Sequence, residues 1–372
     1  MNQTRLAATV AADAPGNSLD RPTPNLKQAR TTVRSVVDKA QPVLRRLVGA
    51  LVVIWGVVTV TFLLSRVFTA EPINILAPED APAEVRERIR VELGLDQSLE
   101  IQYFKFLGQL VRGNLGMSYL TRQPVADDLS SRLPATAELA VYALLIGVTV
   151  GLISGVVAAV WRGSAVDAIV RILTIGGLSI PQFWIGLVLI WCFFIQLGIA
   201  PGPSGRLPIG VDPPPSITGL YSLDAILSGQ WSLIGPVMGQ LALPVLTLSV
   251  SVFAPIARST RSAMVVALDS DYVRTATAMG ISRRRIWFVY ALKNSLLAVM
   301  TLLASAVGWI FSGSVLVEGI FGWPGVGQYA LNALQASDYP AVQGFVLYAA
   351  VLYVAIYAML DHAYVLADPR MR

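Results

Sequence analysis

The stretch DSDYVRTATAMGISRRRIWFVYALKNS, residues 269–295, lies between two long apolar segments and decides how the chain is organised. It carries Arg274, Arg283, Arg284, Arg285 and Lys293 in a chain that is otherwise poor in charge. Of the 372 residues, 55% are hydrophobic and only 14% are charged, against roughly 25% charged residues in soluble domains. Together with a mean hydropathy of +0.62, this composition predicts an integral membrane protein.

Six apolar segments are long enough to cross a bilayer core, which takes about 20 helical residues. They cover residues 47–68, 136–160, 171–196, 238–259, 296–318 and 344–366. In the second segment, Gly147, Gly151 and Gly155 recur at every fourth residue. That spacing predicts a close helix–helix contact in lipid. The predicted fold class is therefore an all-α integral membrane protein with six transmembrane helices.

The distribution of basic residues predicts the orientation of these helices. Four basic segments lie on one side if there are six spans, namely the tail before residue 47, the link at Arg162, the loop 260–295 and the C-terminus. The other side holds residues 70–135, 197–237 and 319–343. The last two of these carry only Arg206 as a cation. The positive-inside rule then predicts that both termini are cytoplasmic, and the net charge of +5 reflects topology and not nucleic-acid binding.

The segments outside the spans have distinct characters. Residues 1–42 are polar, contain several prolines and lack the apolar region of a cleavable signal peptide, so we expect a disordered cytoplasmic tail before a membrane domain at 43–372. In the outer segment 70–135, apolar residues at helical spacing predict two short amphipathic helices. These residues are Val85, Ile89 and Leu93, followed by Ile101, Phe104 and Leu107.

Motifs for catalysis or cofactor binding are not apparent. None of the lysines follows a glycine as in a phosphate-binding loop, and the sole histidine, His362, stands at the end of the last span. Few ionisable residues fall within the spans, and Arg66, Glu138, Arg171 and Glu318 all lie near span ends. Proton-coupled carriers keep such groups at mid-membrane. The pattern therefore argues against a secondary transporter or an intramembrane hydrolase and indicates a conduit that takes its energy from a partner.

The sequence of the basic loop predicts a short helix that ends at a glycine. Asp269 and Asp271 lie near its start, where negative charge suits the helix dipole, and Gly280 follows Met279 as a stop signal. A second helix then opens with three arginines and runs into the next span. Two interpretations remain open, an elbow that docks a partner and an ordinary basic loop that holds lipid headgroups.

The stretch DYVRTATAMGISRRRIWFVYALKNSLL resembles the cytoplasmic loop of binding-protein-dependent ABC importer permeases, in the form found in dipeptide and oligopeptide permeases. The Glu-Ala-Ala triplet of the family reads Arg274-Thr275-Ala276 here, so its glutamate is absent, whereas Gly280 matches the family's glycine. Family members often have a proline near the end of the motif, and this chain has Ala298 at that position. Four further stretches resemble the same subfamily in order, namely LGLDQSLEIQYFKFLGQLVRGNLGMSY (93–119), SIPQFWIGLVLI (179–190), VEGIFGWPGVGQ (317–328) and LADPRMR (366–372).

The resemblance covers about residues 45–372 and implies a type I ABC importer permease fold in the bacterial cytoplasmic membrane. It implies the first-permease, B-type subunit of a dipeptide or oligopeptide importer. The implied partners are a second permease subunit, two cytoplasmic ATPase subunits or domains, an extracytoplasmic substrate-binding protein and membrane lipid, with no nucleic acid. ATP and Mg would be bound by the ATPases, so this chain is expected to hold no cofactor or metal and to catalyse no reaction.

Two alternatives stand beside this interpretation. Relatives with the same motifs import nickel, glutathione or haem, and nothing in the sequence separates these cargoes from peptides. A protein of a different class, a lipid-binding or assembly protein that does not transport, would use the arginines alone and would need no ATPase.

The resemblance also implies roles for individual residues. The coupling helix that ATPases would grip comprises Asp271, Tyr272, Arg274, Thr275, Ala276, Ala278, Met279 and Gly280. A projecting turn in the loop 319–343 is the candidate contact for the binding protein, with Phe321, Trp323, Pro324 and Gly325. The candidates for a pore lining are Ser179, Gln182, Trp184, Ser312 and Ser314, although such residues more often pack between helices.

Overall fold

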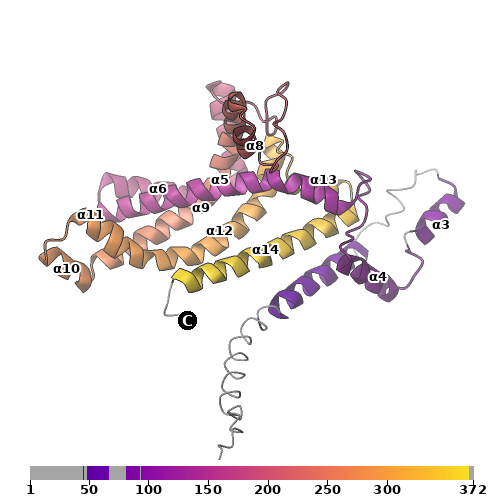
Figure 1. Cartoon of the computed structure of the whole chain (residues 1–372), viewed down its shortest axis with the longest axis horizontal. Coiled ribbons are helices and arrows are strands. Elements are labelled where there is room, and N and C mark those ends of the chain that lie inside the picture. The colour runs from indigo at the N-terminus through magenta and orange to yellow at the C-terminus, as the bar shows by residue number, and fades with distance from the viewer. Residues whose placement is uncertain (1–44, 46–47, 67–80, 93, 368–372) are drawn as a thin grey trace, which may run out of the picture. The chain divides into compact units, whose positions relative to one another are not determined.

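The computed structural model describes residues 45, 48–66, 81–92 and 94–367 (Figure 1). The predicted tail 1–42 lies outside these residues, as do Leu93 and the C-terminal residues 368–372. The chain divides into two units, Met1–Val53 and Ile54–Arg372, and the contacts below lie within the second. The elements of its described part are helices, apart from one isolated β-bridge between Met117 and Pro124.

Four helices are long and apolar enough to cross a membrane. They are Val48–Arg66, α5 (Val125–Val160), Trp231–Leu268, which comprises the short helix η2 (Trp231–Leu233) and α9 (Ile234–Leu268), and the Tyr339–Met359 part of α14 (Tyr339–Ala367). Two bent helix pairs raise this number to six if each pair counts as one span. They are α6 (Ala165–Ser179) with α7 (Gln182–Leu189) and η1 (Ile190–Gln196), and the end of α12 (Leu292–Phe321) with α13 (Val326–Gln335). The all-α membrane class is confirmed.

The third predicted span, residues 171–196, is not one straight helix. The chain breaks between Ser179 and Gln182, and the two halves are bent by 112°. Pro181 explains the break, because the residue before a proline is disfavoured in helical geometry. Ile180 accordingly has extended angles, with φ −88° and ψ 130°.

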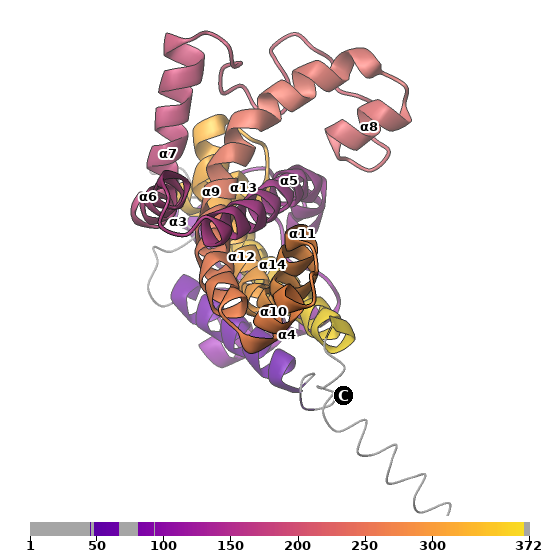
Figure 2. The ribbon, with the colours of Figure 1, turned by 90° about the vertical axis from the view of Figure 1, so that its left-hand side faces the viewer.

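The main packing contact joins α5 and α9, which lie side by side in Figures 1 and 2. Three glycines of α5 each face one side chain of α9 and leave no room for a Cβ atom. The pairs are Gly147 with Val252, Gly151 with Ile256 and Gly155 with Thr260, and an added Cβ would lie 2.7, 2.9 and 2.6 Å from the nearest atom of each partner. The close contact predicted from the glycine spacing is confirmed.

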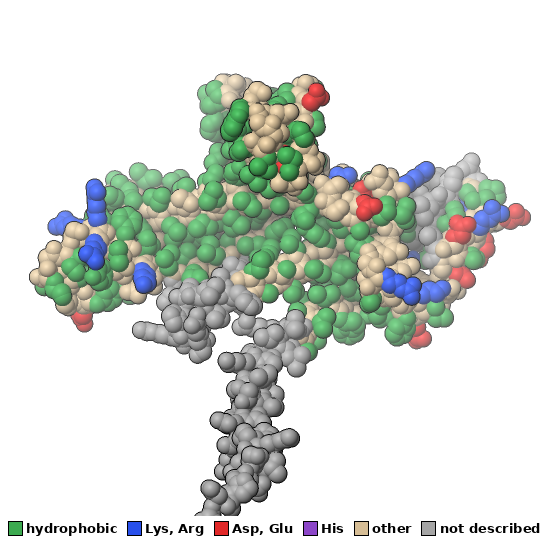
Figure 3. Space-filling view, viewed as in Figure 1, with side chains coloured by type: hydrophobic (Ala, Val, Ile, Leu, Met, Phe, Trp, Pro, Cys, Tyr) green, Lys and Arg blue, Asp and Glu red, His purple; other side chains and the backbone are tan. Residues whose placement is uncertain are grey.

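Helix α9 is the centre of the remaining packing. Helices α6, α7 and α12 all contact it, and α13 joins α12 to α14. The buried cluster includes Leu139 of α5, Leu248 of α9 and Ile310 of α12. Figure 3 shows hydrophobic side chains over the long helices, with Lys and Arg at the end that carries α10 (Asp271–Ala278) and α11 (Arg283–Arg285) and again at the opposite end.

The outer segment forms two helices, α3 (Ala83–Glu92) and α4 (Leu99–Val111), close to the two predicted positions. Helix α4 has apolar residues on two faces, and one of them packs against the Val48–Arg66 helix. Phe62 contacts Tyr103 and Phe106, with ring centroids 5.2 and 5.6 Å apart, whereas Ile101 and Phe104 are 50% and 71% exposed. Apolar residues recur at helical spacing on both faces of α4, so periodicity alone did not decide which face packs.

Candidate functional site

The basic loop folds as an elbow of two short helices. Helix α10 covers Asp271–Ala278 and ends at Met279. Gly280 follows with φ +75°, and the N–H of Ile281 donates to the carbonyl of Ala276 at 3.1 Å. A left-handed glycine after the last helical turn is the stop that the sequence predicted. Helix α11 and the π-helical segment η3 (Ile286–Ala291) then lead into α12.

One face of α10 packs against other residues of the same chain. Val273 and Ala276 are buried against Ile286 of η3. The outward face consists of Asp271, Tyr272, Arg274, Thr275, Thr277, Ala278, Met279 and Gly280. The small residues of α10 therefore lie in two environments, because Ala276 is buried beneath the elbow while Ala278 and Gly280 are exposed. Met279, which is 67% exposed, is the most prominent apolar group on the outward face.

The turn between α5 and α6 contacts the chain on both sides of α10. Trp161 packs edge-on against Trp287 with ring centroids 6.4 Å apart, and Trp287 follows α11. Arg162 Nη1 lies 3.5 Å from a carboxylate oxygen of Asp269, which precedes α10. One contact lies before α10 and the other after α11. The elbow is therefore held by the α5–α6 turn as well as by its own connections to α9 and α12.

The same turn is fixed to α9 by a two-pronged ion pair. Arg261 donates through Nε and Nη2 to both carboxylate oxygens of Asp167, at 2.6 and 2.8 Å. Asp167 also accepts from the N–H of Gly163 at 3.0 Å. Two parallel charge-assisted hydrogen bonds define the orientation of both groups. The elbow, the α5–α6 turn and α9 thus form one connected assembly.

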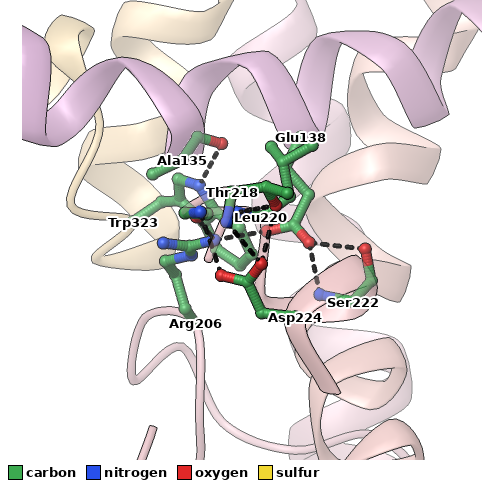
Figure 4. A network of polar contacts seen from close by, with 9 residues as sticks. Ala135, Glu138, Arg206, Thr218, Leu220, Ser222, Asp224 and Trp323 are labelled. Carbon is green, nitrogen blue, oxygen red and sulfur yellow. Dashed lines mark hydrogen bonds and ion pairs between the residues drawn. The ribbon is translucent and has the colours of Figure 1, made fainter. Parts of the chain in front are cut away.

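At the other end of α5, a buried polar network joins the loop 197–220 to the helix (Figure 4). Glu138 of α5 accepts from Arg206 Nη2 at 2.7 Å and from the N–H and Oγ of Ser222 at 2.8 and 2.7 Å. Arg206 also donates to the carbonyl of Gly219 at 2.8 Å. The two charged side chains are only 1% and 9% exposed, so each charge depends on the other for compensation.

Neighbouring groups complete this network around α8 (Tyr221–Leu227). The guanidinium of Arg206 stands 3.4 Å from the centre of the Tyr221 ring. Asp224 accepts from the N–H and Oγ1 of Thr218, each at 2.7 Å, and from the N–H of Gly219 at 2.9 Å. Burial acts to raise the pKa of Asp224, but these hydrogen bonds outweigh it and hold the pKa below its usual range.

The predicted projection at Trp323 is wrong. Trp323 is fully buried, and its Nε1 donates to the carbonyl of Ala135 at 2.9 Å. Phe321 and Gly325 are buried as well, which leaves Pro324 exposed among the four predicted contact residues. The physical reason is the left-handed turn at Gly322, with φ +63°, after which the chain packs against α5.

A buried carboxylate organises this turn. Glu318 accepts from Thr136 Oγ1 at 2.6 Å and from the N–H of Gln328 at 2.9 Å. Thr136 in turn accepts from the N–H of Val326 at 2.9 Å. A Cβ at Gly325 would lie 2.5 Å from the carboxyl group of Glu318. Thr136 and Glu318 thus accept hydrogen bonds from N–H groups in the first turn of α13, which have no acceptor within the helix, so the Gly/Pro turn supports α13.

The predicted pore residues differ in their exposure and in their contacts. Gln182 joins three helices, because its Nε2 donates to Ser251 Oγ at 2.6 Å while its amide lies against Gly313. Ser314 is buried and donates to the carbonyl of Phe311. Ser179 and Trp184 are exposed, and the side chain of Ser312 is outside the described part. Gln182 therefore joins α7, α9 and α12, whereas Ser314 bonds within α12.

Glu138 and Arg206 are the site residues that sequence reasoning missed. Glu138 was considered only as a charge near a span end. Arg206 was noted only as an isolated cation in an outer loop. That isolation was the available signal, because a lone arginine in an apolar protein needs an acidic partner when it is buried.

The fold is that of an all-helical membrane protein, and comparison with known proteins identifies its family. The chain belongs to the binding-protein-dependent transport system inner membrane components, whose family model matches residues 147–372. The companion model for the N-terminal part of such membrane components matches residues 40–140. The protein is thus a permease of the bacterial inner membrane.

Individual relatives are similar over nearly their whole length. The probable D,D-dipeptide transport system permease of Escherichia coli (strain K12) is 41% identical over 87% of this chain and 95% of its own. The di/tripeptide transport system permease of Pseudomonas aeruginosa (strain UCBPP-PA14) is 40% identical over 88% and 97%. The dipeptide permease of E. coli (strain K12) is 35% identical over 89% and 98%.

Proposed function

We propose that this permease forms half of the pore of an ATP-driven importer of dipeptides and short oligopeptides. The relatives named above are permeases of dipeptide or di/tripeptide systems and match 87–89% of this chain. A second permease subunit completes the pore, two ATPases bind ATP and Mg, and an extracytoplasmic binding protein delivers the peptide. This chain supplies no catalytic group of its own.

The observation that carries the proposal is the elbow of α10. It presents Tyr272 and Met279 outward, while Val273 and Ala276 anchor it from below. A short helix that is anchored on one face and apolar at its outer tip is suited to a groove on a partner. ATP-driven closure of the ATPases would displace α10, and the bracketing contacts at Trp161 and Arg162 would pass the movement to α5 and α6.

The experiment is transport by the complete importer in proteoliposomes, with alanyl-alanine as the probe. Met279→Ala should lower peptide uptake per ATP hydrolysed, because it removes the apolar tip of the elbow. Met238→Ala is the matched control, since Met238 is an exposed methionine on α9 far from the elbow in sequence. Equal uptake and equal ATP use in both variants would contradict the role of α10.

Cargo is tested separately in the same vesicles. The wild-type importer should accumulate alanyl-alanine and should not accumulate nickel, glutathione or haem. Uptake of one of these three without peptide uptake would retain the permease assignment and overturn the peptide cargo.

A further inference from the structure

A polar cavity of about 250 Å³ lies where the Val48–Arg66 helix meets α3 and α4. Phe62 and Phe106 line its apolar part, with their rings stacked 5.6 Å apart. The rest of the lining is polar and includes two cations, one carboxylate and several glutamine amides. The proposed transport mechanism assigns no role to these groups.

The two cations are Arg66 and Lys105. Neither forms a hydrogen bond or ion pair with another residue in the described part of the chain, and Arg66 is half-buried. A guanidinium and an ammonium that line one cavity and form no ion pair within the described residues favour an anion that accepts several hydrogen bonds. Phosphate has this property.

The same cavity also holds acceptors that lack donors. The Oε1 atoms of Gln97 and Gln102 are buried without a hydrogen-bond partner, although Gln102 Nε2 donates to the carbonyl of Gln97 at 2.9 Å. A buried acceptor without a donor costs about 1–3 kcal/mol. The carboxylate of Glu92 lines the same cavity. Three oxygen acceptors, one of them charged, favour an ammonium group.

The surroundings place the cavity at a membrane boundary. It lies at the end of a candidate membrane span, and Arg66 is the last residue of that span. Helix α4 exposes Leu99, Ile101, Phe104 and Val111. A helix that exposes large apolar groups beside a membrane span fits the interfacial layer of a bilayer.

We propose that this cavity binds the headgroup of an aminophospholipid such as phosphatidylethanolamine. The phosphate contacts Arg66 and Lys105, and the ammonium contacts Gln97, Gln102 and Glu92. The volume suits a headgroup alone, because pockets for whole small ligands span about 300–1,000 Å³. The acyl chains extend along the apolar Val48–Arg66 helix, where Leu63 and Leu64 are exposed.

The test measures lipid binding to the purified full-length chain in detergent by native mass spectrometry. Phosphatidylcholine is the matched lipid, because it keeps the phosphate and the positive charge but has no N–H donor. Wild-type protein should prefer phosphatidylethanolamine by about tenfold or more, the effect of a charge-assisted hydrogen bond. Gln102→Leu should remove this preference, and Arg66→Gln should weaken the binding of both lipids.

Two further variants separate specific from general effects. Lys105→Gln changes an exposed cavity residue and should weaken phosphate binding even if Arg66→Gln fails to fold. Arg112→Gln removes an exposed arginine that follows α4 outside the cavity and should change nothing. Equal binding of the two lipids by wild-type protein would overturn the proposal, as would a preference for phosphatidylglycerol. Displacement of the lipid by alanyl-alanine would assign the cavity to a peptide.

Discussion

At the scale of single residues, the close contact of α5 with α9 depends on positions where no side chain fits. A Cβ at Gly155 would stand 2.6 Å from Cβ of Thr260 and 2.7 Å from the carbonyl oxygen of Ala257. We expect Gly155→Ala to lower the free energy of unfolding by about 1–3 kcal/mol, because overpacking forces the two helices apart. Reversible unfolding in mixed micelles, followed by circular dichroism, measures the change.

Gly108→Ala is the matched control for this substitution. Gly108 is also helical, in α4, but a Cβ there would meet no atom within 4 Å. The change should be neutral or should stabilise the chain by up to about 1 kcal/mol, because alanine favours helix more than glycine. Equal losses at both glycines would contradict the packing explanation.

The buried pair of Glu138 and Arg206 gives a second prediction at this scale. Glu138→Gln should lower the free energy of unfolding by about 3–5 kcal/mol, because it leaves the guanidinium buried without a counter-charge. Reversible unfolding in mixed micelles, followed by circular dichroism, also measures this change. Arg162→Gln breaks an exposed ion pair with Asp269 and should change the free energy by only about 0–1 kcal/mol. Similar effects of both variants would show that burial does not control the strength of these pairs.

At the scale of elements, the attachment of α10 to the α5–α6 turn predicts a transport defect without a catalytic one. Trp161→Ala removes an aromatic contact worth about 0.5–1.5 kcal/mol. Uptake per ATP hydrolysed by the complete importer should fall about twofold to tenfold. Trp231→Ala, at an exposed tryptophan in η2, should have no such effect. Unchanged coupling in Trp161→Ala would show that movement passes only through the ends of α10.

Elements also differ in how well local sequence predicted them. The end of α10 followed from Gly280, because a left-handed turn is a property of one residue and its neighbours. The break after Ser179 was missed although Pro181 was visible, because the apolar run 171–196 was long enough for a single span. A local steric rule outweighed overall hydropathy at that point.

At the scale of the whole molecule, the distribution of charge predicts two faces on opposite sides of the membrane. Ser282→Cys, in the elbow, should react with a membrane-impermeant maleimide only after the cells are permeabilised. Ser216→Cys, in the loop before α8, should react in intact cells. Both positions are exposed. A Cys192→Ala background removes the single native cysteine, and labelling of both sites from one side would contradict six spans.

The sequence by itself determined the membrane class, the positions of most long helices, the glycine face of α5, the stop at Gly280 and the family. These properties depend on composition, on periodicity or on a few adjacent residues, so they are present before any packing occurs. Family membership then indicated which partners to expect. The contacts of this chain with those partners remain predictions.

Only the tertiary structure decided which polar groups meet and which aromatic residues are covered. Glu138 meets Arg206 and Ser222 across 68 and 84 residues of sequence, and Trp323 bonds to Ala135 across 188. A glycine- and proline-rich turn around Trp323 looked like an exposed projection when read alone. The buried carboxylate of Glu318 and the surface of α5 draw it inward instead, because burial follows from packing between distant elements and not from local composition.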